Sequence, residues 1–237
     1  MISNALLRAL VVLALLLGSH ALSEAASITW DFTGSGGSGS YGNSRTFTQN
    51  GVTVTVTAWG YTAGASDNAF EIAAVGQWST GLGVCNKAET CADPEHQVDN
   101  VGPDDWVLFT FSTPVDPTSI RIDPYGTYDT DVSYWAIVTP SLNLTNKTYS
   151  DLSALGFVRV DQNGPTTTNP QDVSIISPVV SALLFGAQLG GEAYADRFKI
   201  ASLQHQCLSR HLSYCSAVAW QGSESGDESP FRIESSS

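Results

Sequence analysis

Alternation of apolar and polar residues, the pattern of strands with one buried face, recurs through the middle of the chain. Residues 52–59 (VTVTVTAW) alternate strictly, and the Asn50-Gly51 pair before them predicts a tight hairpin with residues 45–48. Residues 106–111 (WVLFTF) are almost entirely apolar, which predicts a central strand covered on both faces. The other expected strands are residues 28–32, 69–78, 119–123, 132–138, 157–160, 173–176, 179–185 and 197–203.

Turn signals lie between these segments and set the expected architecture. Pro114 and Pro117 are expected to break strand pairing before residues 119–123. Glycines at 81–84 predict a turn, and residues 149–155 predict a single helical turn. About ten short strands separated by turns are typical of an all-β fold. We therefore expect a single β-sandwich, jelly-roll-like, over residues 27–203.

Composition narrows the functional classes. Charged residues make up 14% of the 237 residues, and the formal net charge is −13. Such a charge repels phosphate backbones and anionic lipid headgroups, so we expect neither nucleic acid nor a peripheral membrane surface as a partner.

Both ends of the chain differ from its middle. Residues 1–26 predict a signal peptide, with Arg8 before an apolar run at 9–18 and a cleavage site near Ala26. Residues 204–237 predict a polar, disordered tail with no apolar run of membrane length. Export permits disulfides.

Cys85 and Cys91 enclose a short loop, and in an exported protein they predict a disulfide. Closing so short a loop contributes roughly 2–3 kcal/mol in the loop-entropy model. A zinc site is the alternative, but it needs about four ligands and only His96 lies nearby. His96 itself is expected to be a loop histidine bonded to backbone rather than a catalytic base.

Oxygen-bearing side chains are concentrated after the cysteine loop: Asp93, Glu95, Asp99, Asn100, Asp104 and Asp105. Such oxygens suit Ca²⁺, and we place the candidate calcium site at Asp99, Asn100, Asp104 and Asp105. The alternative is a set of solvated acids and turn formers, since Asp and Asn bond their own backbone in turns. The spacing is not that of an EF-hand. Asp129 and Asp131 form a second acidic pair.

Aromatic residues raise the question of sugar binding. Trp59, Trp106 and Trp135 are expected to fill the core, as large aromatic side chains generally do. Tyr125 and Tyr128 flank a glycine in an expected loop and are the better candidates for ligand binding.

The central stretch resembles a known family. The segment GLGVCNKAE, then PEHQVDNVGPDDWVLFTF and DTDVSYWAI, is similar to the exosortase-dependent surface proteins. The resemblance covers roughly residues 28–203, and its most specific points are residues 81–84, Cys85 and residues 96–100. It implies an exported bacterial β-sandwich associated with the envelope and the extracellular polymer matrix. It brings no catalytic residues to carry over.

The tail departs from this family, whose members end in a PEP-CTERM sorting signal: Val-Pro-Glu-Pro, an apolar helix and a basic end. With G or C in most third codon positions, reading one base earlier near Gln206 restores Val-Pro-Glu-Pro, an apolar stretch and an Arg pair. We therefore interpret the tail as a frameshifted sorting signal. The protein would then be released rather than anchored.

The sequence thus predicts a secreted or cell-surface bacterial protein without enzyme activity, structural or adhesive in role. Its expected partners are extracellular polysaccharide or other surface components. The alternative is a carbohydrate-binding module with a calcium-stabilised loop. A glycoside hydrolase with two carboxylates across a cleft is a third class, which spacing alone does not reveal.

Overall fold

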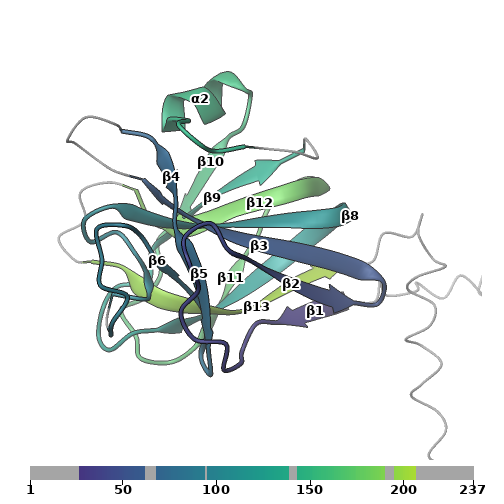
Figure 1. Cartoon of the computed structure of the whole chain (residues 1–237). Coiled ribbons are helices and arrows are strands. Elements are labelled where there is room, and N and C mark those ends of the chain that lie inside the picture. Colours follow the sequence, from purple (N-terminus) through teal and green to yellow (C-terminus); the bar gives the residue numbers. More distant parts are fainter. Residues whose placement is uncertain (1–26, 62–67, 94, 139–142, 190–194, 207–237) are drawn as a thin grey trace, which may run out of the picture.

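The computed structural model describes residues 27–61, 68–93, 95–138, 143–189 and 195–206. The regular structure of these residues consists of antiparallel β-strands and one short helix, which confirms the expected all-β class (Figure 1). The expected signal peptide and residues 207–237 of the expected tail lie outside the described residues. Within those residues, no helix has both the length and the apolar character to cross a bilayer.

Thirteen strands of the described chain are hydrogen-bonded into one continuous sheet. The strands are β1 (Ser27–Asp31), β2 (Ser44–Gln49), β3 (Val52–Tyr61), β4 (Phe70–Ile72), β5 (Ala74–Trp78), β6 (Gly81–Cys85), β7 (Val98–Asp99), β8 (Asp104–Pro124), β9 (Val132–Ile137), β10 (Arg159–Gln162), β11 (Gln171–Ser174), β12 (Val180–Ala187) and β13 (Arg197–Gln206). The helix, α2, spans Tyr149–Ala154 and begins at a capping box formed by Thr148 and Asp151.

The long strand β8 belongs to two layers. Its first part pairs with β3 and β12, and its second part pairs with β11 and β13. Pairing with β3 ends at Phe111, and pairing with β13 begins at Asp116. Pro114 and Pro117 lie where the partners change. The expected break at these prolines is therefore wrong, because the strand continues through them and moves from one layer to the other.

The central core lies between the layers that β8 joins. One layer holds β2, β3, β4, β9, β10 and β12, and the other holds β1, β5, β6, β7, β11 and β13 (Figure 1). Val107 and Phe109 of the first part of β8 and Ile120 and Ile122 of the second part are fully buried in one cluster. Alternate residues along both parts of β8 therefore face the same core.

The outer face of the first layer is also covered. Trp106 and Leu108 are buried in a second cluster together with Leu152 of α2. Trp106 Nε1 donates to Tyr149 Oη at 3.0 Å, and that hydroxyl donates to Asp104 Oδ2 at 2.9 Å. Burial on both faces confirms the expectation for residues 106–111 and explains why this strand is apolar without alternation.

The hairpin at Asn50-Gly51 has the expected form. Gln49 pairs with Val52, which leaves a two-residue turn, and both turn residues have positive φ, 48° at Asn50 and 77° at Gly51. This is the backbone that Asn-Gly turns favour, because both residues tolerate the left-handed region.

One expected strand is divided. Residues 69–78 form β4 and β5, which pair with β3 and β6 respectively and so lie in different layers. Ile72 is 40% exposed, while Phe70 and Ala74 are buried. The single-strand prediction is wrong because the chain changes layers at Ala73.

The expected glycine turn at residues 81–84 is also wrong. These residues form the buried strand β6, which pairs with β5. A side chain at Gly83 would meet the carbonyl oxygen of His96, and Gly81, at φ +127°, lies against the backbone of Ile200. The glycines allow close approach of neighbouring backbones rather than a reversal of the chain.

We predict that Phe109→Ala lowers the free energy of unfolding by about 3–5 kcal/mol, because it leaves a cavity between the layers. Chemical denaturation of the two proteins measures the difference. Val158→Ala is the control, since Val158 is 73% exposed and its truncation should be nearly neutral. Equal losses from both substitutions would contradict a core centred on β8.

Candidate functional site

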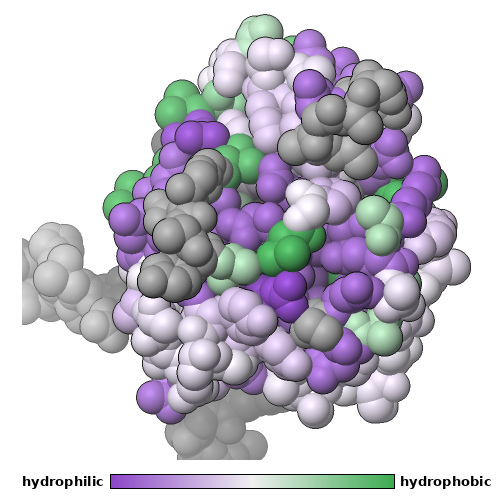
Figure 2. All heavy atoms as spheres, turned by 90° about the vertical axis from the view of Figure 1, so that its left-hand side faces the viewer, coloured by the Kyte–Doolittle hydropathy of each residue, from purple (hydrophilic) through white to green (hydrophobic). Residues whose placement is uncertain are grey.

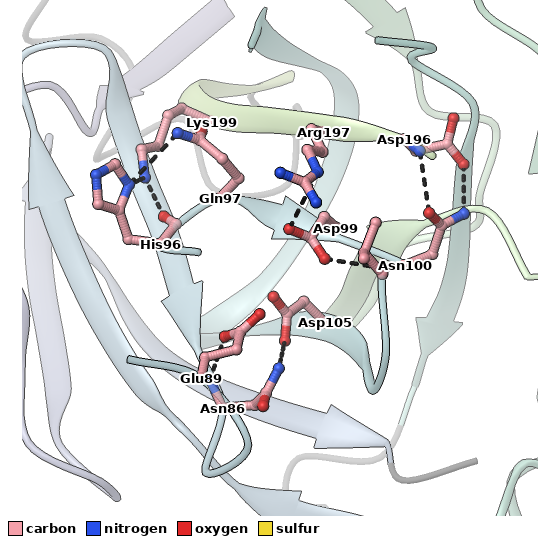
Figure 3. A network of polar contacts seen from close by, with 11 residues as sticks. Asn86, Glu89, His96, Gln97, Asp99, Asn100, Asp105, Asp196, Arg197 and Lys199 are labelled. Carbon is pink, nitrogen blue, oxygen red and sulfur yellow. Dashed lines mark hydrogen bonds and ion pairs between the residues drawn. The ribbon is translucent and has the colours of Figure 1, made fainter. Parts of the chain in front are cut away.

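Polar side chains gather where the cysteine loop, β7 and the first residues of β8 and β13 meet (Figure 3). We call this group the polar centre. Its members are Asn86, Glu89, His96, Gln97, Asp99, Asn100, Asp105, Asp196, Arg197 and Lys199. Most of these side chains are buried, although charged residues are rarely buried without a partner.

The disulfide positions one side of the polar centre. Cys85 and Cys91 are bonded, with Cα atoms 5.3 Å apart, as expected from their spacing. Within the ring, the backbone N–H of Asn86 donates to Glu89 Oε2 at 2.9 Å. The Asn86 amide in turn donates to Asp105 Oδ1 at 3.1 Å. The ring is thereby attached to the beginning of β8.

Three carboxylates converge at this point. Glu89 of the ring, Asp99 of β7 and Asp105 of β8 each offer an oxygen, and these oxygens lie within 4.8 Å of one another. Asp105 is fully buried, and its Oδ2 makes no hydrogen bond of normal geometry with the described residues. Figure 3 shows this oxygen on the side of Asp105 that faces Asp99 and Glu89.

Burial disfavours the charged forms of all three groups. It raises the pKa of Glu89 to about 7 and that of Asp99 to about 6. Burial also raises the pKa of Asp105 well above its ordinary value, and the negative charges of Glu89 and Asp99 add to the rise. The Asn86 amide and the Asp99 backbone N–H offset part of this effect.

Of the two nearby cations, Arg197 contacts one of the three carboxylates and Lys199 contacts other groups. Arg197 Nε lies 3.8 Å from Asp99 Oδ2. Lys199 Nζ lies 2.6 Å from His96 Nδ1, donates to the carbonyl oxygen of His96, and sits 3.8 Å above the Trp78 ring. Burial lowers the pKa of Lys199 to about 7. His96 also stacks on Trp78, so the expectation that this histidine contacts backbone omitted its main partners.

The four residues of the expected calcium site do not converge. Asp99 and Asp105 lie together, but Asp104 is on the opposite face of β8 and accepts the hydrogen bond from Tyr149. Asn100 donates to Asp196 Oδ2 at 2.8 Å and accepts from the Asp196 backbone N–H at 3.0 Å. The residue missing from the expected set is Glu89.

A second acidic group is formed by Asp129, Asp131 and Asp196, again with oxygens within 4.8 Å of one another. Oxygens of this group accept hydrogen bonds from the protein backbone. Asp196 Oδ1 accepts from the Asp131 backbone N–H at 2.9 Å, and Asp131 Oδ1 accepts from the Gly164 N–H at 2.5 Å. This group ties β13 to the segments before β9 and after β10.

Tyr125 and Tyr128 lie together at the surface. Their rings are stacked with centroids 6.1 Å apart, and Tyr125 Oη donates to Asp93 Oδ2 at 3.3 Å. Tyr128 is 38% exposed, and the Arg197 guanidinium lies 4.8 Å from its ring centroid. The pair therefore borders the polar centre through Arg197.

A separate cavity of about 240 Å³ lies beside β9, β10 and β11. Amide side chains line it, but they bond within the protein: Gln162 Nε2 donates to the Ser174 carbonyl at 2.7 Å, and Gln171 donates to Thr130 Oγ1.

Comparison of the sequence with protein-family models and with curated proteins gave no match.

We predict that stability gained on acidification depends on Asp196. Burial, with the charges of Asp131 and Asp129, raises the pKa of Asp196 to about 7. A carboxyl group with a raised pKa stabilises the folded state when it is protonated. This contribution to the free energy of unfolding is fully present when the pH is below the ordinary pKa near 3.8, and it is lost as the pH rises through about 7. In buffer containing a chelator, Tm should therefore rise as pH falls from about 8 to 5, less steeply in Asp196→Asn.

Thermal unfolding followed by circular dichroism across this pH range measures both slopes. Asp172→Asn is the control, because Asp172 is an exposed carboxylate paired with Arg121. Parallel slopes in wild type and Asp196→Asn would contradict the prediction.

Proposed function

We propose that this chain is an exported, non-enzymatic protein with a structural or adhesive role at the bacterial cell surface or in the extracellular matrix. The observation that carries the proposal is the Cys85–Cys91 disulfide, which holds Asn86 and Glu89 in the polar centre. Disulfides persist in oxidising compartments and are rare in the cytosol. A fold that uses one to hold Glu89 beside two buried carboxylates is suited to work outside the cytoplasm.

The surface supports the same role. Figure 2 views the side that is on the left in Figure 1, where hydrophilic residues dominate and hydrophobic residues form small separate groups. A continuous apolar patch is the usual mark of a stable protein–protein interface. The visible face is better suited to weak, hydrated contacts with a polymer.

Burial of the close carboxylates favours a non-enzymatic role over glycoside hydrolysis. Asp99 and Asp105 are 1% and 0% exposed. A glycosidase needs two carboxyl groups on either side of a bond that the substrate brings between them. These two groups lie inside the protein.

The two segments that most resemble exosortase-dependent surface proteins lie side by side in the fold. Residues 81–84 and Cys85 form β6, and residues 96–100 include β7. Gly83 lies against the His96 carbonyl, so the two motif segments contact each other. The close packing of Gly83 against the His96 backbone therefore involves both segments that carry the resemblance.

We predict that the protein isolated from culture medium or the cell surface has Cys85 and Cys91 oxidised. Alkylation before and after reduction, read by peptide mass spectrometry, separates this pair from Cys207 and Cys215 of the tail. The double variant Cys85→Ser, Cys91→Ser should lose roughly 2–3 kcal/mol of unfolding free energy. Protein retained in the cytoplasm with both thiols free would overturn the proposal.

The second candidate is a carbohydrate-binding module, which the stacked pair of Tyr125 and the exposed Tyr128 favours. An aromatic face presents apolar area to the ring of a sugar. If polysaccharide binds here, Tyr128→Ala should weaken binding about tenfold, while Tyr128→Phe retains it because the ring remains. A glycan array followed by titration of the best ligand measures this. Equal affinity in the alanine variant would exclude the pair as the binding surface.

A further inference from the structure

We propose that Glu89, Asp99 and Asp105 bind a divalent cation of the hard, oxygen-preferring type, Ca²⁺, and that this ion joins the cysteine ring to β7 and β8. The site differs from the one expected from the sequence, because Glu89 replaces Asn100 and Asp104. It does not depend on the proposed function.

The spacing of the oxygens fits one ion. Calcium–oxygen distances are about 2.3–2.6 Å, so two ligands of the same ion lie at most about 5 Å apart. The three carboxylates offer oxygens within 4.8 Å of one another. They come from three separate segments, and each segment is fixed by its own contacts: the ring by the disulfide, Asp99 by pairing with Arg197 of β13, and Asp105 by pairing with Gly60 of β3.

The unpartnered oxygen of Asp105 points to a ligand. A buried carboxylate oxygen without a hydrogen bond is costly, because it has lost its hydration and gained nothing in exchange. Oδ1 of Asp105 accepts from Asn86, while Oδ2 is buried and faces Asp99 and Glu89 without a partner of normal geometry among the described residues (Figure 3). A cation between the three groups satisfies this oxygen.

The protein's own cations balance only part of this charge. Arg197 reaches Asp99 only, at 3.8 Å. Lys199 directs its ammonium group at the His96 carbonyl and the Trp78 ring. Neither cation forms an ion pair within 4.0 Å of Asp105 or Glu89 in the described structure.

The donor chemistry selects the class of ion. All three side chains offer carboxylate oxygens, which suit Ca²⁺, Mg²⁺ and Mn²⁺, whereas zinc and copper prefer nitrogen and sulfur. The sulfur atoms nearby are in a disulfide and offer no thiolate. Ligands drawn from loops and strand ends favour Ca²⁺ over Mg²⁺, which requires a small and nearly ideal octahedron.

The second acidic group provides an internal contrast. Asp129, Asp131 and Asp196 are equally close, but both oxygens of Asp196 accept hydrogen bonds, from the Asp131 N–H and from Asn100. Protein donors already satisfy these oxygens. We therefore assign the cation to the first group alone.

The test uses the full, oxidised chain after removal of metals by a chelator. Addition of about 10 mM CaCl2 should raise Tm by about 5–10 °C, the shift expected for an extracellular-type site of Kd near 10⁻⁴ M. Isothermal titration with CaCl2 should give one binding event per chain. MgCl2 and MnCl2 are titrated in parallel to identify the preferred ion.

Two substitutions separate a lost ligand from a misfolded protein. Asp105→Asn should abolish the Tm shift, and Glu89→Gln, on a half-buried loop residue, should weaken binding at least about tenfold while the chain stays folded. Asp104→Asn is the matched control, because Asp104 adjoins Asp105 in sequence but faces Tyr149. Asp129→Asn tests the second acidic group, and both controls should keep the wild-type response.

Two outcomes would overturn the proposal. The first is a wild-type Tm and titration that do not respond to Ca²⁺, Mg²⁺ or Mn²⁺, with Asp105→Asn more stable than wild type. That result would mean that bound protons, rather than a metal ion, relieve the buried charge. The second is a Ca²⁺ response that survives in Glu89→Gln and Asp105→Asn but is lost in Asp129→Asn, which would move the site to the other group.

Discussion

The fold depends on one strand serving two layers. Strand β8 pairs with β3 and β12 along its first part and with β11 and β13 along its second. It therefore fixes the position of one layer relative to the other. The central core forms where its inward residues from both parts meet, and the outer cluster forms on the opposite face of its first part. The strands that do not pair with β8 pair with β3, β12 or β13, either directly or through one further strand.

The same strand explains how two neighbouring aspartates acquire unrelated roles. Successive side chains of a strand point to opposite faces. Asp104 therefore accepts a hydrogen bond from Tyr149 and helps to fix α2 on the outer face, whereas Asp105 turns inward to the polar centre. An acidic pair that looks like one feature in the sequence thus belongs to two regions of the protein.

Local patterns in the sequence were sufficient for the hairpin at Asn50-Gly51, the doubly covered strand beginning at Trp106 and the disulfide ring, since each depends on residues close together in the chain. They were not sufficient for β6, whose glycines serve packing against Ile200 and His96 rather than a turn. The period of two along a strand would have separated Asp104 from Asp105. No local pattern reveals that Asn100 bonds Asp196, 96 residues away, or that the ring carries Glu89 to Asp105.

The polar centre connects the cysteine ring, β7, β8 and β13 without an apolar core of its own. The ring contacts β8 through Asn86 and Asp105, and β7 meets β13 through Asp99 and Arg197. Because all these contacts are electrostatic and buried, their strength depends on how completely the carboxylate charge is balanced. The apolar core between the layers contains none of these groups, so the charge balance of the polar centre acts on the ring and its neighbouring strand ends and not on that core.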